Sequence, residues 1–366
     1  MGGVRDNMTV IDVDGHIVED LNDLREFMDP RIQWITRPNR PFPSAIGAFP
    51  NLDGLHSFMG AAEGGMIPKP RPRVDASDHR PGSPEDWVAA LDKTGIAHAV
   101  LVTSDGLGIG NHRGREYLRL LCRAYNDYVA TSYARHDPRL HPYALIPMQH
   151  PDDAVAELRR AVKELGLVGA IVPSTGLPLH AGHEYFWPVY KEASDLECVL
   201  AFHGGSNRGI GLDSFSNLTA SHILHHPSAL MIAFVAMVYD GVFERFPTMR
   251  AAFLEGGCGW IAFLLDRVDR EAELPQPDYD GYRHNMPRKL FESGRVMVGC
   301  EGNDGIIPYL AKTIGVGSLG FSSDYPHEAD FVDVNREIEE TLEGDELSDT
   351  DKRAILGENA LKFFRF

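Results

Sequence analysis

The chain has 366 residues, 43% of them hydrophobic, which allows one large domain or two to three ordinary ones. Its formal net charge of −18 makes nucleic acid and anionic membranes poor partners, because the surface repels them. The four cysteines form no CxxC pair, and the N-terminal residues contain no signal-peptide or membrane-spanning segment. We therefore expect a cytoplasmic protein with reduced thiols.

Short apolar runs alternate along the chain with longer segments of helical periodicity, which is typical of βα units around a parallel sheet. The predicted strands are 8–13, 97–103, 142–147, 168–172, 198–202, 250–254, 296–300 and 318–322. The predicted helices are 84–93, 113–135, 152–165, 184–194, 221–245, 260–273, 305–313, 332–342 and 350–364. Eight strand–helix pairs suit an α/β fold of the (β/α)8 TIM-barrel type in a single domain, residues 1–366. An open doubly wound sheet is the alternative.

One segment interrupts this alternation. Residues 30–84 carry many prolines and several glycines and show little helical periodicity, so we predict a long irregular insertion there. Because the insertion follows the first strand, it would begin at the active-site face of a barrel. Long loops inside compact domains are usually functional or disordered, so we interpret it as a lid or an oligomer contact.

Polar side chains follow three of the predicted strands at the point where each strand ends. In "VIDVDGHIVED", Asp12, Asp14 and His16 alternate, and alternate residues of a strand point the same way. The strand of "CVLAFHGGSN" ends in His203, and that of "LGFSSDYPHEAD" leads to Asp324. Barrel enzymes place their functional groups at these ends, and carboxylates and imidazoles bind divalent metals. The three signals together predict a metal site.

Other candidates are less specific. Glu255 ends the sixth strand and could be a ligand, a general base or a carboxylate that orients His203. One histidine of the group His222, His225 and His226 is expected to face the pocket. The candidate substrate-binding residues are Arg208, Glu301 and His327, of which the arginine could bind a carboxylate through two hydrogen bonds.

The motifs "IDVDGH", "HGG", "FERFPTMRAAFLEGG", "CEGND", "FSSDYPH" and "ILGENALKFF" together resemble the amidohydrolase-related family, which includes aminocarboxymuconate-semialdehyde, γ-resorcylate and carboxyvanillate decarboxylases. The resemblance implies a (β/α)8 barrel with one metal, often zinc or manganese. It places the ligands at Asp14, His16, His203 and Asp324. Many relatives have histidine in place of Asp14, and relatives often have a catalytic histidine where this chain has Glu255.

The resemblance favours a non-oxidative decarboxylase with one divalent ion, Zn, Mn or Fe, acting on a small carboxylate-type molecule. The residues equally allow a hydrolase of a C–N, C–O or C–C bond, with Asp324 as the base. An iron-dependent oxygenase is a third hypothesis, in which Glu255 and a nearby histidine alter the metal site. A silent barrel that supports a related active subunit is the fourth. We expect a homo-oligomer, a dimer or a tetramer, with or without a related barrel subunit.

Overall fold

The structure is a computed structural model of the chain and describes residues 8–33, 79–205, 210–212, 218–271, 286–302, 304–327 and 329–366. Most of the predicted insertion, residues 34–78, lies outside these ranges, as does Arg208. The expectation that the insertion forms a lid or an oligomer contact therefore remains a prediction.

In the described part of the chain, nine strands, all paired in parallel, fill the eight predicted strand positions. They are β1 (Val10–Ile17), β2 (Ile96–Thr103), β3 (Leu140–Pro142), β4 (Ala144–Leu145), β5 (Gly169–Pro173), β6 (Val199–His203), β7 (Arg250–Leu254), β8 (Val296–Cys300) and β9 (Leu319–Phe321). The third predicted strand is divided at Tyr143 into β3 and β4. β3 pairs with β2, and β4 pairs with β5.

The ring of strands closes between its first and last members. The backbone N–H of His16 donates to the carbonyl of Tyr325 at 2.7 Å, and that of Asp324 donates to the carbonyl of Asp14 at 3.1 Å. Pairing runs from β1 to β3 and from β4 to β9, so these bonds complete a closed barrel. The predicted TIM barrel is confirmed, and the open doubly wound sheet is wrong.

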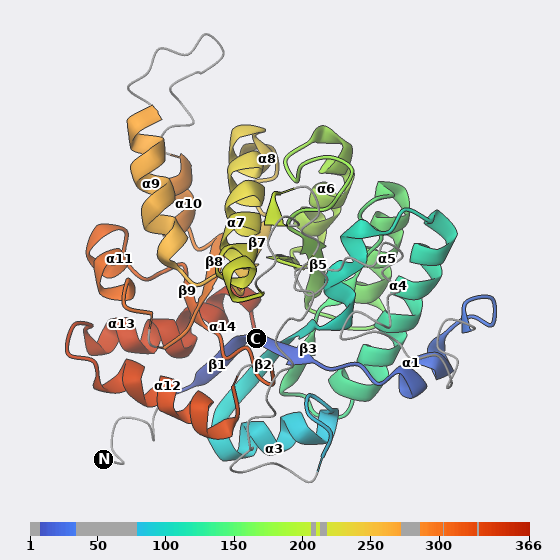
Figure 1. Cartoon of the computed structure of the whole chain (residues 1–366), viewed down its shortest axis with the longest axis horizontal. Helices are drawn as coiled ribbons and strands as arrows, with labels where there is room; N and C mark the ends of the chain where they lie inside the picture. Colours follow the sequence, from blue (N-terminus) through green and yellow to red (C-terminus); the bar gives the residue numbers. More distant parts are fainter. Residues whose placement is uncertain are drawn as a thin grey trace.

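Helices surround the strands on all sides (Figure 1). They are α1 (Leu21–Phe27), α3 (Pro84–Thr94), α4 (Arg115–Val129), α5 (Pro151–Lys163), α6 (Trp187–Leu196), α7 (Leu218–Tyr239), α8 (Val242–Arg245), α9 (Gly259–Glu271), α10 (Met286–Glu292), α11 (Ile307–Thr313), α12 (Phe331–Glu343), α13 (Asp349–Arg353) and α14 (Asn359–Phe364). The predicted helix 221–245 ends earlier, because Gly241 adopts a left-handed φ of 74° between α7 and α8. The short helices α1 and α10 were not predicted.

Helix α3 packs against β1, the strand that carries Asp14 and His16. Ser83 caps its first turn, Pro84 occupies the first helical position, and Gly95 ends it in a left-handed conformation. This places Trp87 against β1, where its indole Nε1 donates to the carbonyl of His16 at 2.9 Å. The helix thus supports the backbone of a predicted metal ligand.

Because Gly15 has no side chain, the Trp87 ring can pack directly against β1 at this position. A Cβ at this position would lie 2.2 Å from Cη2 of Trp87, so Gly15→Ala forces the ring or β1 to move. We expect a loss of about 1–3 kcal/mol in the free energy of unfolding, measured by urea denaturation. Gly317→Ala is the control, because no atom lies within 4 Å of the added Cβ. Equal losses in the two variants would show that the Trp87 contact does not restrict β1.

Candidate metal centre

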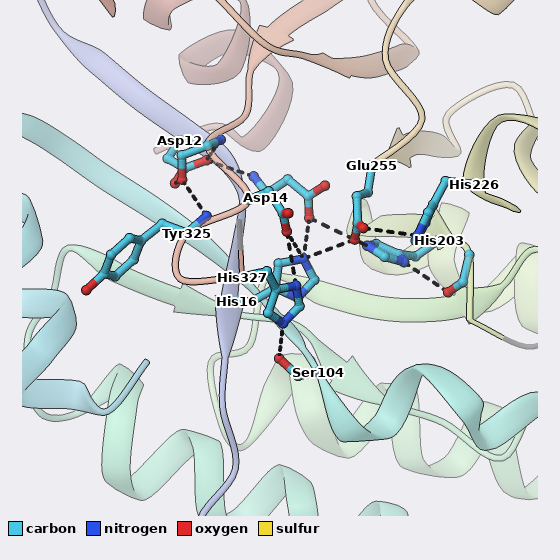
Figure 2. A network of polar contacts seen from close by, with 12 residues as sticks. Asp12, Asp14, His16, Ser104, His203, His226, Glu255, Tyr325 and His327 are labelled. Atoms are coloured by element: carbon cyan, nitrogen blue, oxygen red, sulfur yellow. Dashed lines mark hydrogen bonds and ion pairs between the residues drawn. The ribbon is translucent and has the colours of Figure 1, made fainter. Parts of the chain in front are cut away.

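Among the described residues, seven ionisable side chains converge at the C-terminal end of the barrel, and five of them are candidate metal ligands from the sequence (Figure 2). Asp14 and His16 lie on β1, His203 ends β6, Glu255 follows β7, and Asp324 follows β9. The first three are at most 1% exposed, and the two carboxylates after β7 and β9 are 17% and 16% exposed. The structure therefore brings together all four predicted ligands and adds Glu255.

The separations of the facing atoms suit a single ion. Nε2 of His16 lies 3.2 Å from Oδ1 of Asp324 and 3.7 Å from Oδ1 of Asp14. Nε2 of His203 lies 4.0 Å from the same oxygen of Asp14 and 2.8 Å from Oε2 of Glu255. Bonds of about 2.0–2.2 Å to one metal place ligand atoms about 3–4 Å apart. No large rearrangement of these side chains is needed to bind a divalent ion.

The tautomer of His203 also suits a metal. Its Nδ1 lies 2.9 Å from the carbonyl oxygen of Gly204, which can only accept, so Nδ1 carries the proton and donates. The lone pair of Nε2 then points into the site, as in many metal-binding histidines. Within the described part of the chain, Oδ1 of Asp14 and Nε2 of His16 are buried without a well-aligned hydrogen bond. A cation would satisfy these atoms together.

The negative charges of the clustered carboxylates repel one another unless a cation is present. Burial, together with the negative charges of Glu255 and Asp324, holds the pKa of Asp14 well above its usual range. Burial also lowers the pKa of His16 to about 3, which keeps this imidazole neutral and available as a ligand. Carboxylates held so close together are stable as anions when a divalent ion binds between them.

Asp12 has a different role from the one its alternation suggests. It is fully buried, and its side chain accepts hydrogen bonds from the backbone N–H of Asp14 and from the N–H and hydroxyl of Ser323. The hydroxyl contact is 2.6 Å long. Asp12 therefore links β1 to Ser323, the residue before Asp324, through hydrogen bonds. In this way it positions two candidate ligands, Asp14 and Asp324, and is not itself a candidate ligand.

Two contacts could not be found by sequence reasoning. Of the three candidate histidines, His226 reaches the site, where its Nε2 lies 3.0 Å from Oε1 of Glu255. Ser104 follows β2, and its hydroxyl lies 2.7 Å from Nε2 of His327, whose Nδ1 lies 3.1 Å from Oδ1 of Asp324. The position of Ser104 at a strand end was a usable signal, but its histidine partner is 223 residues away.

The remaining candidates are still predictions. Glu301 follows β8 and is exposed, and it does not belong to the clusters of facing ligand atoms found among the described residues. Arg208 lies outside the described residues. His327 borders the site through Asp324, in agreement with its predicted place, although substrate binding by it is a proposal.

The sequence profile of the amidohydrolase family matches residues 11–366. The chain is 25% identical over 245 residues to 2-amino-3-carboxymuconate-6-semialdehyde decarboxylase of Dictyostelium discoideum, an alignment that covers 66% of each protein. It is 33% identical over 230 residues to gamma-resorcylate decarboxylase of Rhizobium radiobacter, covering 57% of this chain and 66% of that protein. The chain thus belongs to the amidohydrolase family, and the resemblance found in its motifs is confirmed.

Solved structures share the whole fold. An amidohydrolase from Mycobacterium avium subsp. paratuberculosis superposes with a TM-score of 0.75 at 22% identity, covering 98% of this chain and 99% of that one. A dihydroxybenzoic acid decarboxylase from Polaromonas, solved with bound manganese and an inhibitor, gives a TM-score of 0.67 at 20% identity, covering 98% and 97%. These similarities support the barrel over essentially its full length.

We expect a chelator to destabilise the protein, because it removes the cation that the clustered carboxylates need. At a free metal concentration one hundred times Kd, binding contributes about 2.7 kcal/mol. The thermal unfolding midpoint should fall by several degrees after dialysis with a chelator and recover on addition of Mn²⁺. In His203→Ala the chelator should have no effect. An unchanged midpoint in the wild-type protein would contradict a resident metal at this site.

Proposed function

We propose that the protein is a metal-dependent, non-oxidative decarboxylase of a small carboxylic acid, with aromatic acids as the first class to test. The observation that carries this proposal is the convergence of Asp14, His16, His203 and Asp324 at the end of the barrel. The curated relatives, which are named as decarboxylases of carboxylated muconate and resorcylate compounds, support the choice of reaction.

The four convergent side chains would hold one divalent ion, Mn, Zn or Fe. When bound, the ion supplies positive charge that attracts the substrate carboxylate and stabilises the negative charge that develops as the C–C bond breaks. The electron pair of that bond stays on the substrate carbon, which must receive one proton as CO2 leaves. The protein must therefore hold a proton near the site and replace it after each turnover.

The chain Ser104–His327–Asp324 provides a route for that proton. Its contacts of 2.7 Å and 3.1 Å connect the partly exposed Ser104 hydroxyl with the carboxylate after β9. A proton could pass along these groups to the substrate carbon. The same route run in reverse would take a proton from a water molecule, so hydrolysis with Asp324 as the base is the second candidate function.

Asp324→Asn keeps the shape of the side chain but removes its charge and basicity. We expect CO2 release from the best substrate in a panel of aromatic carboxylic acids to fall by at least about a hundredfold, with an unchanged circular dichroism spectrum. Ser104→Ala should cost less, because solvent can replace the hydroxyl. Near-normal turnover by a folded Asp324→Asn variant would contradict the assigned site, and water addition in place of CO2 release would favour the hydrolase.

We also propose that a second copy of the chain covers the outer face of α7. Ile223, Leu224 and Ile232 on this helix are 68%, 42% and 43% exposed. The stretch Ala220–Tyr239 is apolar enough to cross a membrane, but α7 is a barrel helix and half of the stretch is buried. No Asp, Glu, Lys or Arg occurs from 218 to 239, so two copies with a net charge of −18 each can meet there with least repulsion.

Ile232→Glu places a charge on an exposed apolar position of α7. We expect the variant to be monomeric by light scattering after size exclusion, at concentrations where the wild-type protein is a dimer or tetramer. Val332→Glu is the control, because Val332 is similarly exposed, at 48%, but lies on α12. A monomeric wild-type protein, or a variant that associates as the wild type does, would contradict the proposed interface.

A further inference from the structure

Glu255 occupies the position at the end of β7 where the family resemblance leads one to expect a catalytic histidine. We infer that Glu255 is a fifth protein ligand of the metal, and that His226 positions it by holding its other oxygen. This inference rests on the proposed metal site and adds a residue to it that the four-ligand pattern does not contain.

The two carboxylate oxygens of Glu255 face different partners (Figure 2). Oε2 lies 2.8 Å from Nε2 of His203 and 3.4 Å from Nε2 of His16, both of which are predicted ligand atoms. Oε1 lies 3.0 Å from Nε2 of His226 on α7. These two distances lie on either side of the 3.2 Å between His16 and Asp324, so Oε2 belongs to the same ring of ligand atoms.

The short contact between Glu255 and His203 is favourable only with positive charge beside it. Since Nδ1 of His203 donates to Gly204, the Nε2 of a neutral His203 would direct a lone pair toward Oε2 of Glu255. Two lone pairs 2.8 Å apart repel each other unless a metal ion or an additional proton lies beside them. A metal bound to both atoms removes the repulsion and also satisfies Oδ1 of Asp14 and Nε2 of His16.

The backbone gives a second, independent observation. Among the described residues, the non-glycine residues with left-handed φ are Glu197, Glu255, Asp324 and Arg365. Glu197 and Arg365 end α6 and α14, where this conformation is common. Glu255, at 55°, and Asp324, at 49°, follow strands instead. Such conformations are unfavourable and cluster at functional sites, so both strand-end acids are held in the same strained geometry.

His226 is held in place to direct Glu255. It lies in α7, and its ring packs on Gly204, where a Cβ would be only 2.5 Å from Nδ1 of His226. With Nδ1 against this glycine, Nε2 is left to donate to Oε1 of Glu255. Ligating carboxylates commonly carry such a hydrogen bond on the oxygen that does not bind the metal.

The added ligand changes which metals the site prefers. Asp14, Glu255 and Asp324 with two imidazoles make five protein donors, three of them carboxylates. Zinc usually takes four ligands in a tetrahedron, whereas Mn²⁺ and Fe²⁺ accept more ligands and favour carboxylate oxygens. We therefore expect the fifth ligand to narrow the difference in affinity by which a four-ligand site binds Zn²⁺ more tightly than Mn²⁺.

The test measures metal binding without reference to turnover. Mn²⁺ is titrated into metal-free wild-type protein and into Glu255→Gln, Glu255→Asp and His226→Gln, followed by calorimetry and by the EPR spectrum of bound Mn²⁺. We expect Glu255→Gln to bind at least about a hundredfold more weakly and His226→Gln about tenfold more weakly. Glu255→Gln should also show an altered EPR spectrum. Glu346→Gln, which removes the same charge from an exposed loop, should match the wild type.

The outcomes separate this inference from the proposed function. A Glu255→Gln variant with wild-type Mn²⁺ affinity and spectrum would overturn the inference, and the four-ligand site would stand. Loss of decarboxylation with unchanged metal binding would overturn it as well and assign Glu255 a role in proton transfer. A wild-type protein that binds no Mn²⁺ or Zn²⁺ would contradict the metal site itself. If Glu255→Gln fails to fold by circular dichroism, Glu255→Asp decides, because its shorter carboxylate should weaken binding and change the spectrum.

Discussion

The seam between β1 and β9 is the constraint on which the rest of the structure depends. Here the backbone of His16 pairs with Tyr325 and that of Asp324 pairs with Asp14, while the side chain of Asp12 receives two hydrogen bonds from Ser323, 311 positions away. Candidate metal ligands lie on both sides of this seam. The site therefore exists only when the barrel is closed, and metal binding and folding stabilise each other.

The side chains of the site are costly to bring together, which explains the hydrogen bonds that surround them. Carboxylates and neutral imidazoles at the buried end of a barrel are costly for a protein to assemble without a cation. The left-handed conformations of Glu255 and Asp324 add to that cost. Hydrogen bonds around the site offset this cost. Asp12 accepts one from Ser323 across the seam, Trp87 donates one to the carbonyl of His16, and the carbonyl of Gly204 fixes the tautomer of His203. Each ligand is thus oriented before a metal binds.

Much of the fold could be predicted because parallel strands are buried on both faces and appear as short apolar runs. The strands 250–254 and 296–300 have the predicted bounds. The first strand runs four residues past its predicted end, to Ile17, because its acids and histidine interrupt the apolar run but lie buried inside the barrel. The break at Tyr143 and the left-handed end of α7 at Gly241 depend on tertiary pairing and backbone geometry, which periodicity does not report.

The convergence of the four candidate ligands could be predicted for a related reason: in a barrel, every strand ends at the same face, so polar residues at strand ends converge. The sequence could not predict that His226 is the one of three neighbouring histidines that reaches the site, because this depends on the rotation of α7 about its axis. The contact between Ser104 and His327 could not be predicted either, because it joins two loops whose relative position only the closed barrel determines.

The central claim is that one divalent ion sits among Asp14, His16, His203 and Asp324. Anomalous diffraction from crystals grown with Mn²⁺ tests it most directly, because the difference map locates the metal without reference to activity. We expect one strong peak per chain, with each of these four side chains within about 2.5 Å of it, somewhat beyond ordinary metal–ligand bond lengths. A peak bound by other residues, or no peak in well-diffracting crystals of active protein, would contradict it.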